Sequence, residues 1–196
     1  MTDKIPFGPA DIIVGEGVEA INFDGKATSG EQGEGSSQLQ AEGGSINITP
    51  TFASISSIDY GEGDYDEYST GVGVTVNIVA LKENVKTLKL ALAGTQDVVD
   101  ADSGDVTGLT DAPVGQSNRE KGVPVRIHPR NMGDDNSLDY IVYKMAPTEN
   151  YERPFSLEQG TVNIQLKAYP RDGADASKGA NFYYTGSVDP NAPTTP

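Results

Sequence analysis

The sequence predicts an all-β domain with one flanking α-helix, arranged as a small β-sandwich or an open barrel. Several segments alternate apolar and polar side chains with a period of two, which is typical of half-buried strands. Residues 81–94 instead repeat their apolar side chains with a helical period, and Gly-, Ser- and acid-rich segments separate the elements. Because 196 residues are enough to bury one core, we expect a single domain over residues 1–196.

The first fifth of the chain predicts an arm, two short strands and a loop. Residues 1–10 contain two prolines and a glycine, so we expect an extended N-terminal arm. The stretch "DIIVGEGVEAINFDG" then predicts two strands around the turn from Gly15 to Gly17. Residues 25–44 are rich in Gly, Ser, Glu and Gln and offer little to bury, which predicts a mobile loop.

A long β-hairpin is predicted next. "SINITPTFASI" places Ile46, Ile48 and Phe52 on one face of a strand. "VGVTVNIVA" does the same for a second strand, and its inward residues are Val72, Val74, Val76, Ile78 and Ala80. The two strands flank residues 56–70, which we expect to form the tip of the hairpin. Pro50 lacks a backbone donor and predicts a bulge or a sheet edge.

The predicted helix follows in "LKENVKTLKLALAG". Leu81, Val85, Leu88 and Leu92 recur at helical spacing among lysines, and Gly94 stands where a C-terminal cap would lie. From residue 95 to residue 120 the hydrophobic pattern is lost and aspartates accumulate, so we expect a second, acidic loop there.

Three further strands are predicted in the second half of the chain, in "GVPVRIHP", "LDYIVYKM" and "TVNIQLKAY". Their inward positions in the first and third are Val123, Val125, Ile127, Val162, Ile164, Leu166 and Ala168. Residues 187–196 form a proline-rich C-terminal tail that we do not expect to fold alone.

Composition and charge exclude several classes of function. Fourteen basic and twenty-nine acidic residues give a net charge of −15, which argues against specific DNA binding and against a membrane-surface role. The chain has no cysteine, so disulfides, thiolate catalysis and Cys-ligated zinc are excluded. We recognise no secretion signal and no apolar run long enough to span a membrane, and therefore expect a soluble protein.

Catalytic, metal and cofactor sites find little support. His128 is the one histidine and sits beside Pro129 without a motif, so we expect an ordinary surface or loop histidine. "DADSGD" at residues 100–105 lacks the alternating carboxylates and the later bidentate Glu of a calcium loop. "GEGDYDE" could offer oxygens to a hard cation, but a solvated or interface loop is the simpler interpretation. We expect no catalytic residue, no metal and no cofactor.

Residues 56–70, "SSIDYGEGDYDEYST", are both acidic and aromatic. They hold five acids, three tyrosines and no basic side chain. Exposed aromatic rings gain free energy only when they are covered, and Tyr suits interfaces because it buries area at a low entropic cost. The tyrosines therefore either fold back on their own sheet or contact another subunit. The candidate contact residues are Asp59, Tyr60, Glu62, Asp64, Tyr65, Asp66, Glu67 and Tyr68.

Four pieces of the chain, in this order, resemble the major tail tube protein of long-tailed bacteriophages. They are "PFGPADIIVGEGVEAINFDG", "EGGSINITPTFASISSIDYGE", "GVGVTVNIVALKENVKTLKLALAG" and "GTVNIQLKAYPRDG", which together cover about two fifths of the sequence. The pieces correspond to an arm and strand, a long hairpin, the hairpin's second strand with its helix, and a closing strand. The acidic segment 95–120 departs from the family pattern, as does the absence of an added immunoglobulin-like domain.

The resemblance implies a structural virion protein, not an enzyme. Such subunits form hexameric rings that stack into a hollow tube through which the genome passes into the host, and they contact the tape measure, tail terminator and distal tail or baseplate proteins. The protein would be made in the host cytoplasm and reside in the virion tail, and DNA would pass an acidic lumen without specific binding. Ring closure would turn five polar strand positions to the channel: Ser45, Asn47, Thr49, Thr75 and Asn77.

A surface or secreted β-sandwich binding module, such as an adhesin or a carbohydrate-binding domain, is the alternative. Such modules usually display an aromatic platform, and this chain has no Trp. An enzyme would have to rely on carboxylates from acidic loops, and exposed carboxylic acids stay ionised near neutral pH. Self-assembly distinguishes the tube from both other readings.

Overall fold

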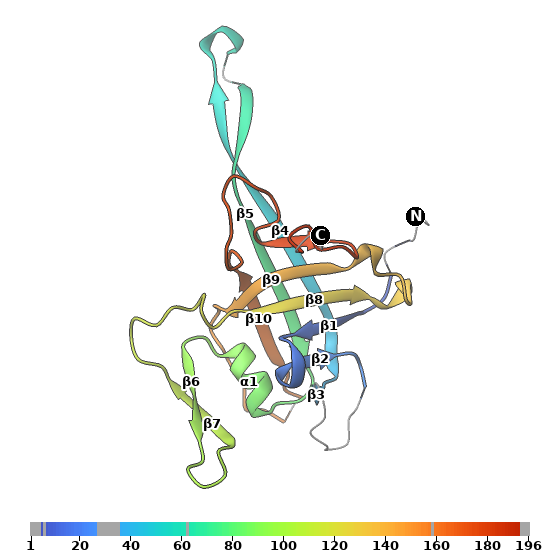
Figure 1. The fold of residues 1–196 in the computed structure, drawn as a ribbon, viewed down its shortest axis with the longest axis vertical. Coiled ribbons are helices and arrows are strands. Elements are labelled where there is room, and N and C mark those ends of the chain that lie inside the picture. The colour runs from blue at the N-terminus through green and yellow to red at the C-terminus, as the bar shows by residue number, and fades with distance from the viewer. Residues whose placement is uncertain (1–4, 6, 27–35, 62, 158, 193–196) are drawn as a thin grey trace.

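A computed structural model describes residues 5, 7–26, 36–61, 63–157 and 159–192 (Figure 1). It is mostly β-sheet with one α-helix, as the sequence predicts. The strands in chain order are β1 Ala10–Val14, β2 Ile21–Phe23, β3 Ser36–Ser37, β4 Gln40–Ser56, β5 Asp64–Ala80, β6 Thr95–Val99, β7 Val106–Asp111, β8 Val123–Pro129, β9 Tyr140–Pro147, β10 Val162–Ala168 and β11 Tyr183–Thr185. The helix is α1 Val85–Ala91, and short 3-10 turns lie at η1 Gly17–Glu19, η2 Ile58–Tyr60, η3 Arg130–Met132 and η4 Asn136–Leu138.

The main sheet has nine strands and curls back on itself. Its order is β3-β2-β1-β8-β9-β10-β5-β4, with β11 paired to β9, while β6 and β7 form a separate two-stranded sheet. The strands at the two ends of this order, β3 and β4, are joined in the chain by residues 38 and 39. Gln38 donates its backbone N–H to the Asn22 carbonyl of β2, and the Leu39 carbonyl accepts from Leu81 just after β5. The two ends of the sheet are thus brought close to each other.

The side chain of Gln40 fastens this closure. Its Nε2 donates to the backbone carbonyls of Ala10 at 2.8 Å and Phe23 at 2.6 Å, and so ties the start of β4 to β1 and β2. Gly44 passes so close to β1 that a Cβ there would lie 2.4 Å from Cδ1 of Ile12. A residue with a Cβ would therefore have to displace the Ile12 side chain and crowd the Asn77 carbonyl, 3.0 Å away, where the two edges of the sheet meet.

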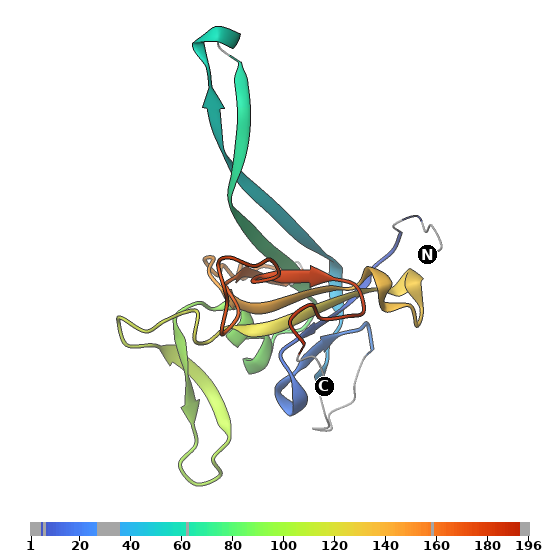
Figure 2. The same ribbon diagram turned by 45° about the horizontal axis from the view of Figure 1, so that its top comes forward.

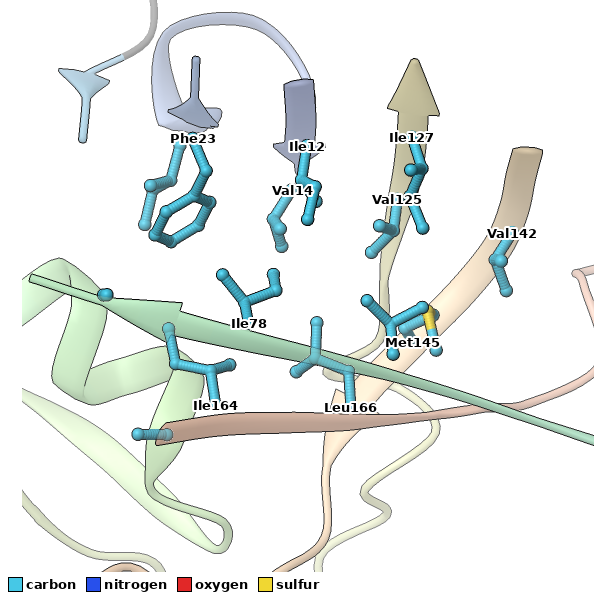
Figure 3. Close-up of a cluster of buried hydrophobic side chains, with 14 of the residues drawn as sticks. Ile12, Val14, Phe23, Ile78, Val125, Ile127, Val142, Met145, Ile164 and Leu166 are labelled. Atoms are coloured by element: carbon cyan, nitrogen blue, oxygen red, sulfur yellow. The ribbon is translucent and has the colours of Figure 1, made fainter. Parts of the chain in front are cut away.

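The core lies inside the curled sheet and includes most of the predicted inward residues. Ile12 and Phe23 of the N-terminal strands face Ile78, Ile164 and Leu166 of β5 and β10, and all five are almost fully buried (Figure 3). Val74 and Val76 are buried as expected, and Ile46 and Ile48 pack against the cluster from the edge strand. Val123 is half-buried, while Val125, Ile127, Val162 and Ala168 are buried. The period-two alternation therefore identified the inner face of the sheet correctly.

The helix is shorter than predicted and buries another face. Asn84 is the N-cap, and its Oδ1 accepts from the Thr87 N–H at 2.9 Å while the Thr87 hydroxyl accepts from the Asn84 N–H at 2.9 Å. This capping box starts the helix at Val85, four residues after Leu81, which therefore lies outside it. Thr87 and Ala91 are the buried positions, and not the predicted leucine stripe. Gly94, with φ of 67°, lies in the turn after the helix and is not its cap.

Three predicted loops contain strands. Within 25–44, residues 27–35 lie outside the described residues, but 36–37 form β3 and 40–44 begin β4. Within 56–70, only residues 57–63 are the tip, because β5 already starts at Asp64. Within 95–120, β6 and β7 form a hairpin. The sequence did not predict these stretches of strand because none of their described side chains is fully buried, so no apolar alternation marks them.

The two ends of the chain attach to the body where they are described. Asn131 Nδ2 donates to the Ile5 carbonyl at 3.0 Å, which holds part of the N-terminal arm, although Ile5 and Phe7 remain exposed. In the tail 187–196, of which residues 187–192 are described, Asp189 accepts from the Tyr143 hydroxyl at 2.6 Å. Asn191 donates to the same hydroxyl at 2.8 Å. The tail is thus fixed to β9 by polar contacts, which its proline content did not predict.

Candidate functional site

The outer halves of β4 and β5 form an arm that projects from the body of the molecule (Figures 1 and 2). We call residues 51–71 the arm. Every described residue in it except Ser57 is exposed, although β4 and β5 stay paired up to Ser56 and Asp64. The arm therefore has the backbone hydrogen bonds of a sheet without the covering layer that usually stabilises one.

A β-bulge marks the point where the arm leaves the body. Thr51 pairs with Gly71 and Phe52 with Ser69, so Thr70 is an extra residue on β5. A bulge bends the strand and increases its twist, and the ribbon visibly twists as it rises from the sheet (Figure 1). Pro50 itself pairs regularly with Val72, but β4 is the edge strand, as the proline predicted. Phe52, predicted to face inward, lies beyond this point and is exposed.

The arm carries large apolar and aromatic side chains at its tip. Ile58 is 95% exposed and Tyr60 is 71% exposed. The rings of Tyr60 and Tyr65 lie against each other, with centroids 5.3 Å apart and planes tilted by 35°. Tyr68, on the stem, is also exposed, so none of the three predicted tyrosines folds back onto the body of the sheet. Of the two readings left open above, the intramolecular one is therefore wrong.

The acids of the arm are exposed alongside these rings. Asp59, Asp64, Asp66 and Glu67 are all exposed, and Glu62 lies outside the described residues. Asp66 accepts from the Glu67 N–H at 2.8 Å. Among the described ion pairs of the protein, none involves an acid of the arm. The tip therefore offers apolar surface within a negative rim.

The five polar positions predicted to face a channel do lie together. Ser45 pairs with Asn77 and Asn47 with Thr75, and Thr49 follows on the same face of β4. Asn77 Nδ2 donates to Ser45 Oγ at 3.3 Å. The face continues onto β10, where Gln165 pairs with Asn77 and Lys167 with Thr75. Hydroxyl and amide groups make up most of this face, and it is opposite the apolar core.

The other end of the molecule holds a pocket of about 680 Å³. It lies between α1, the η1 turn, the start of β6 and the loop before β8. Its apolar lining is Val14, Ile21, Leu90, Leu92, Val123, Pro124, Met145 and Pro147. Lys86, Lys89 and Lys121 line it from the α1 and loop side, and Glu16 and Glu19 from the η1 side. A pocket of this size could hold a drug-sized ligand or a few side chains of a partner.

His128 belongs to a structural network that the sequence did not reveal. Its Nδ1 lies 2.6 Å from Oδ1 of Asp139, and its Nε2 lies 2.8 Å from the Gly133 carbonyl. Asp139 is 1% exposed and also accepts from Arg126 Nε at 2.7 Å. Both ring nitrogens are therefore engaged, which leaves neither to act as a general base. The histidine is half-buried and not the ordinary surface residue we expected.

The acidic residues 100–105 form a turn. The Asp100 carboxylate accepts from the N–H groups of Asp102 and Ser103, both at 2.9 Å, and this holds the β6–β7 hairpin closed. These backbone donors, that of Ser103 first, lower the pKa of Asp100. In the described part of the chain, no three His, Cys, Asp or Glu side chains gather in a way that could hold a metal ion.

Comparisons of the sequence with protein-family models and with curated proteins gave no match. Within the described ranges, no helix has the length and apolar character needed to cross a bilayer.

Proposed function

We propose that this protein is the subunit of a phage tail tube, which self-assembles into stacked hexameric rings around a channel for the viral genome. The arm is the observation that carries the proposal. A protein that exposes Ile58 and three tyrosines on a projecting two-stranded ribbon gains little from it as a monomer, because an isolated hairpin is only marginally stable. Contact with another subunit would bury these side chains and order the ribbon.

The body of the subunit supports the same proposal through its free edge. β4 ends the sheet order, and among the described residues no strand pairs with its outer edge. Native proteins protect such edges or use them to join subunits. In a ring, adjacent sheets would form one continuous wall, with Ser45, Asn47 and Thr75 turned to the channel. Further proteins of the tail, namely the tape measure, the terminator and the distal tail or baseplate proteins, would meet the ends and the interior of this tube.

The polar face would suit a channel for DNA. Six copies at −15 each carry about −90 per ring, which disfavours the counterion release that makes basic surfaces bind DNA. The wall itself would be mainly neutral hydroxyl and amide groups, so the acidic lumen expected from composition would come from the arms and not from the five channel positions. Lys167 would be the one position on this face that weakly attracts the phosphates of DNA.

Negative-stain electron microscopy of concentrated purified protein tests the proposal. We expect hollow, striated tubes, and only rings or monomers from a variant with Tyr60→Ser, Tyr65→Ser and Tyr68→Ser. A control variant changes three tyrosines that pack against the core to Phe, which keeps both the core and the arm intact; they are Tyr140, Tyr151 and Tyr183.

Two results would reject the tube. One is a monodisperse monomer at every concentration, even after seeding with sheared tail material from lysates. The other is tube formation by the Ser variant as readily as by the parent. A monomer that binds in a glycan screen would support the alternative, a binding module.

A further inference from the structure

The tip of the arm and α1, whose residues line the pocket, lie at opposite ends of the molecule (Figures 1 and 2). The arm rises from one end of the sheet, whereas α1, η1 and the base of β6 lie at the other. The tip therefore cannot reach the pocket of its own chain. If the two fit each other, they do so between two copies.

The two surfaces are complementary in polarity. The tip presents Ile58, Tyr60 and Tyr65, all well exposed, and the pocket offers an apolar floor that includes Leu90, Leu92 and Pro147. A pocket of about 680 Å³ lies within the range of roughly 300–1,000 Å³ over which pockets bury most of a ligand's surface. Aromatic side chains seated in such pockets are the usual anchors of interfaces.

The charges also indicate an orientation. The tip carries acids and no basic residue. Lys86, Lys89 and Lys121 form one side of the pocket. Lys89 forms an ion pair with Asp97, with an N–O distance of 2.7 Å. Lys121 donates to the Thr95 carbonyl at 2.7 Å. Lys86 is exposed, and no ion pair is described for it, so its ammonium is available to an incoming carboxylate. Glu16 and Glu19 on the η1 side would repel the acids and direct them toward α1.

We propose that the tip of the arm docks into the α1–η1 pocket of a second copy of this chain. Ile58 and Tyr60 enter the apolar floor, and the acids of the tip meet Lys86 on the α1 side. Because the donor and the acceptor surfaces differ, each copy can give its arm to one neighbour and receive the arm of another, which produces an open-ended stack. The inference rests on the proposed tube, since it names the surface that joins one ring to the next.

Site-specific photo-cross-linking tests the docking. Tyr60 is replaced by p-benzoyl-phenylalanine, and the protein is mixed with a 15N-labelled parent before assembly and irradiation. Mass spectrometry then identifies cross-linked peptides that carry both isotope patterns, which can arise only between two copies. Leu157, which is exposed and lies outside the pocket lining, carries the same probe in a control protein.

We expect the probe at position 60 to join α1 or residues 116–124 of a differently labelled copy, and the probe at 157 not to do so. Lys86→Glu should raise the concentration needed for assembly by about tenfold, because it places an acid opposite acids. Lys178→Glu makes the same charge change outside the pocket lining and should leave that concentration nearly unchanged.

The outcomes separate this inference from the tube itself. If tubes form but the probe at position 60 joins other parts of the neighbour, the docking is wrong and the tube stands. If tubes form and Lys86→Glu assembles as well as Lys178→Glu, the role given to Lys86 is wrong. If neither tubes nor rings nor cross-links form, both proposals fail.

Discussion

The two halves of β5 share one strand and one partner but differ in everything that surrounds them. From Val72 to Ala80, alternate residues are buried in the core, whereas from Asp64 to Gly71 every residue is exposed. β4 pairs with both halves. Pairing alone therefore defines the strand, and the covering layers decide whether a half of it contributes to stability. The body half stabilises the fold, and the arm half is available for a partner.

The same substitution in the two halves of the ribbon should give the largest contrast. Ile78→Ala removes fully buried methyl and methylene groups, and should lower the free energy of unfolding by about 2–5 kcal/mol. Ile55→Ala, at a 46% exposed position of the arm, should change it by less than about 0.5 kcal/mol. Urea unfolding of the monomeric protein measures both. Equal losses would show that the arm is packed in solution.

The buried carboxylate of the body should rank next. Asp139→Asn keeps the shape of the side chain but replaces one carboxylate oxygen by an NH2 group. This NH2 group would then face the N–H donors of Arg126 or His128. We expect a loss of about 1–3 kcal/mol in the free energy of unfolding. Asp172→Asn is the control, because Asp172 also pairs with Arg119 and Lys144 but is 74% exposed, and it should cost little. Similar losses in both variants would contradict this ranking.

The attachment of the C-terminal tail should weaken as the pH rises above about 10. Burial, together with the hydrogen bond to Asp189, raises the pKa of Tyr143 from 10.0 to about 12. The folded protein then keeps this proton where the unfolded chain has lost it, so the stabilisation is complete below pH 10 and disappears as the pH rises toward 12.

Thermal melts of the parent and of Tyr143→Phe between pH 9 and pH 12 measure this effect. The melting temperature should fall further in the parent than in Tyr143→Phe, because the variant has no proton to lose at that site. The pKa values of Tyr151 and Tyr184 are also raised by burial, so both proteins will still respond to alkali. Parallel pH curves would show that Tyr143 does not hold the tail.

The smallest effect should come from the junction of body and arm. A Cβ added at Gly73 would meet the Thr49 carbonyl at 3.8 Å, an ordinary contact, so Gly73→Val fits and favours the extended backbone. Hydrogen exchange of the arm amides 64–70 should slow by less than about tenfold, since strand propensities span only about 1 kcal/mol. Unchanged exchange would mean that the arm frays from its tip and not from its base.

Sequence reasoning worked where a core selects the side chains. The alternation in Val74, Val76 and Ile78 and in Val162, Ile164 and Leu166 located strands and faces because burial demands apolar residues at every second position. It failed for 40–44, 64–70 and 95–111, where no residue is fully buried and the side chains therefore follow no such rule. The helix start was also missed, since the Asn84–Thr87 capping box overrides the leucine spacing.

The candidate site was predictable only in part. An acidic, tyrosine-rich stretch between two strands was enough to single out residues 56–70, and the pairing of polar residues such as Ser45 with Asn77 follows from hairpin register. The pocket could not be predicted, because it brings together Glu16, Lys86 and Lys121 from three distant segments of the chain. The network of His128 and Asp139 depends likewise on how β8 lies beside β9.

The extra residue Thr70 has a consequence for the geometry of the proposed assembly. The bulge sets the direction in which the arm leaves its own subunit, and in a stack that direction fixes how far each ring is rotated relative to the one below. Deleting Thr70 would leave both flanking pairs able to form and straighten the ribbon. We expect tubes of altered helical twist, or tubes whose axis is stiffer or more curved, with the subunit fold unchanged. Helical reconstruction from electron micrographs would measure a mechanical property of the whole filament that a single backbone residue determines.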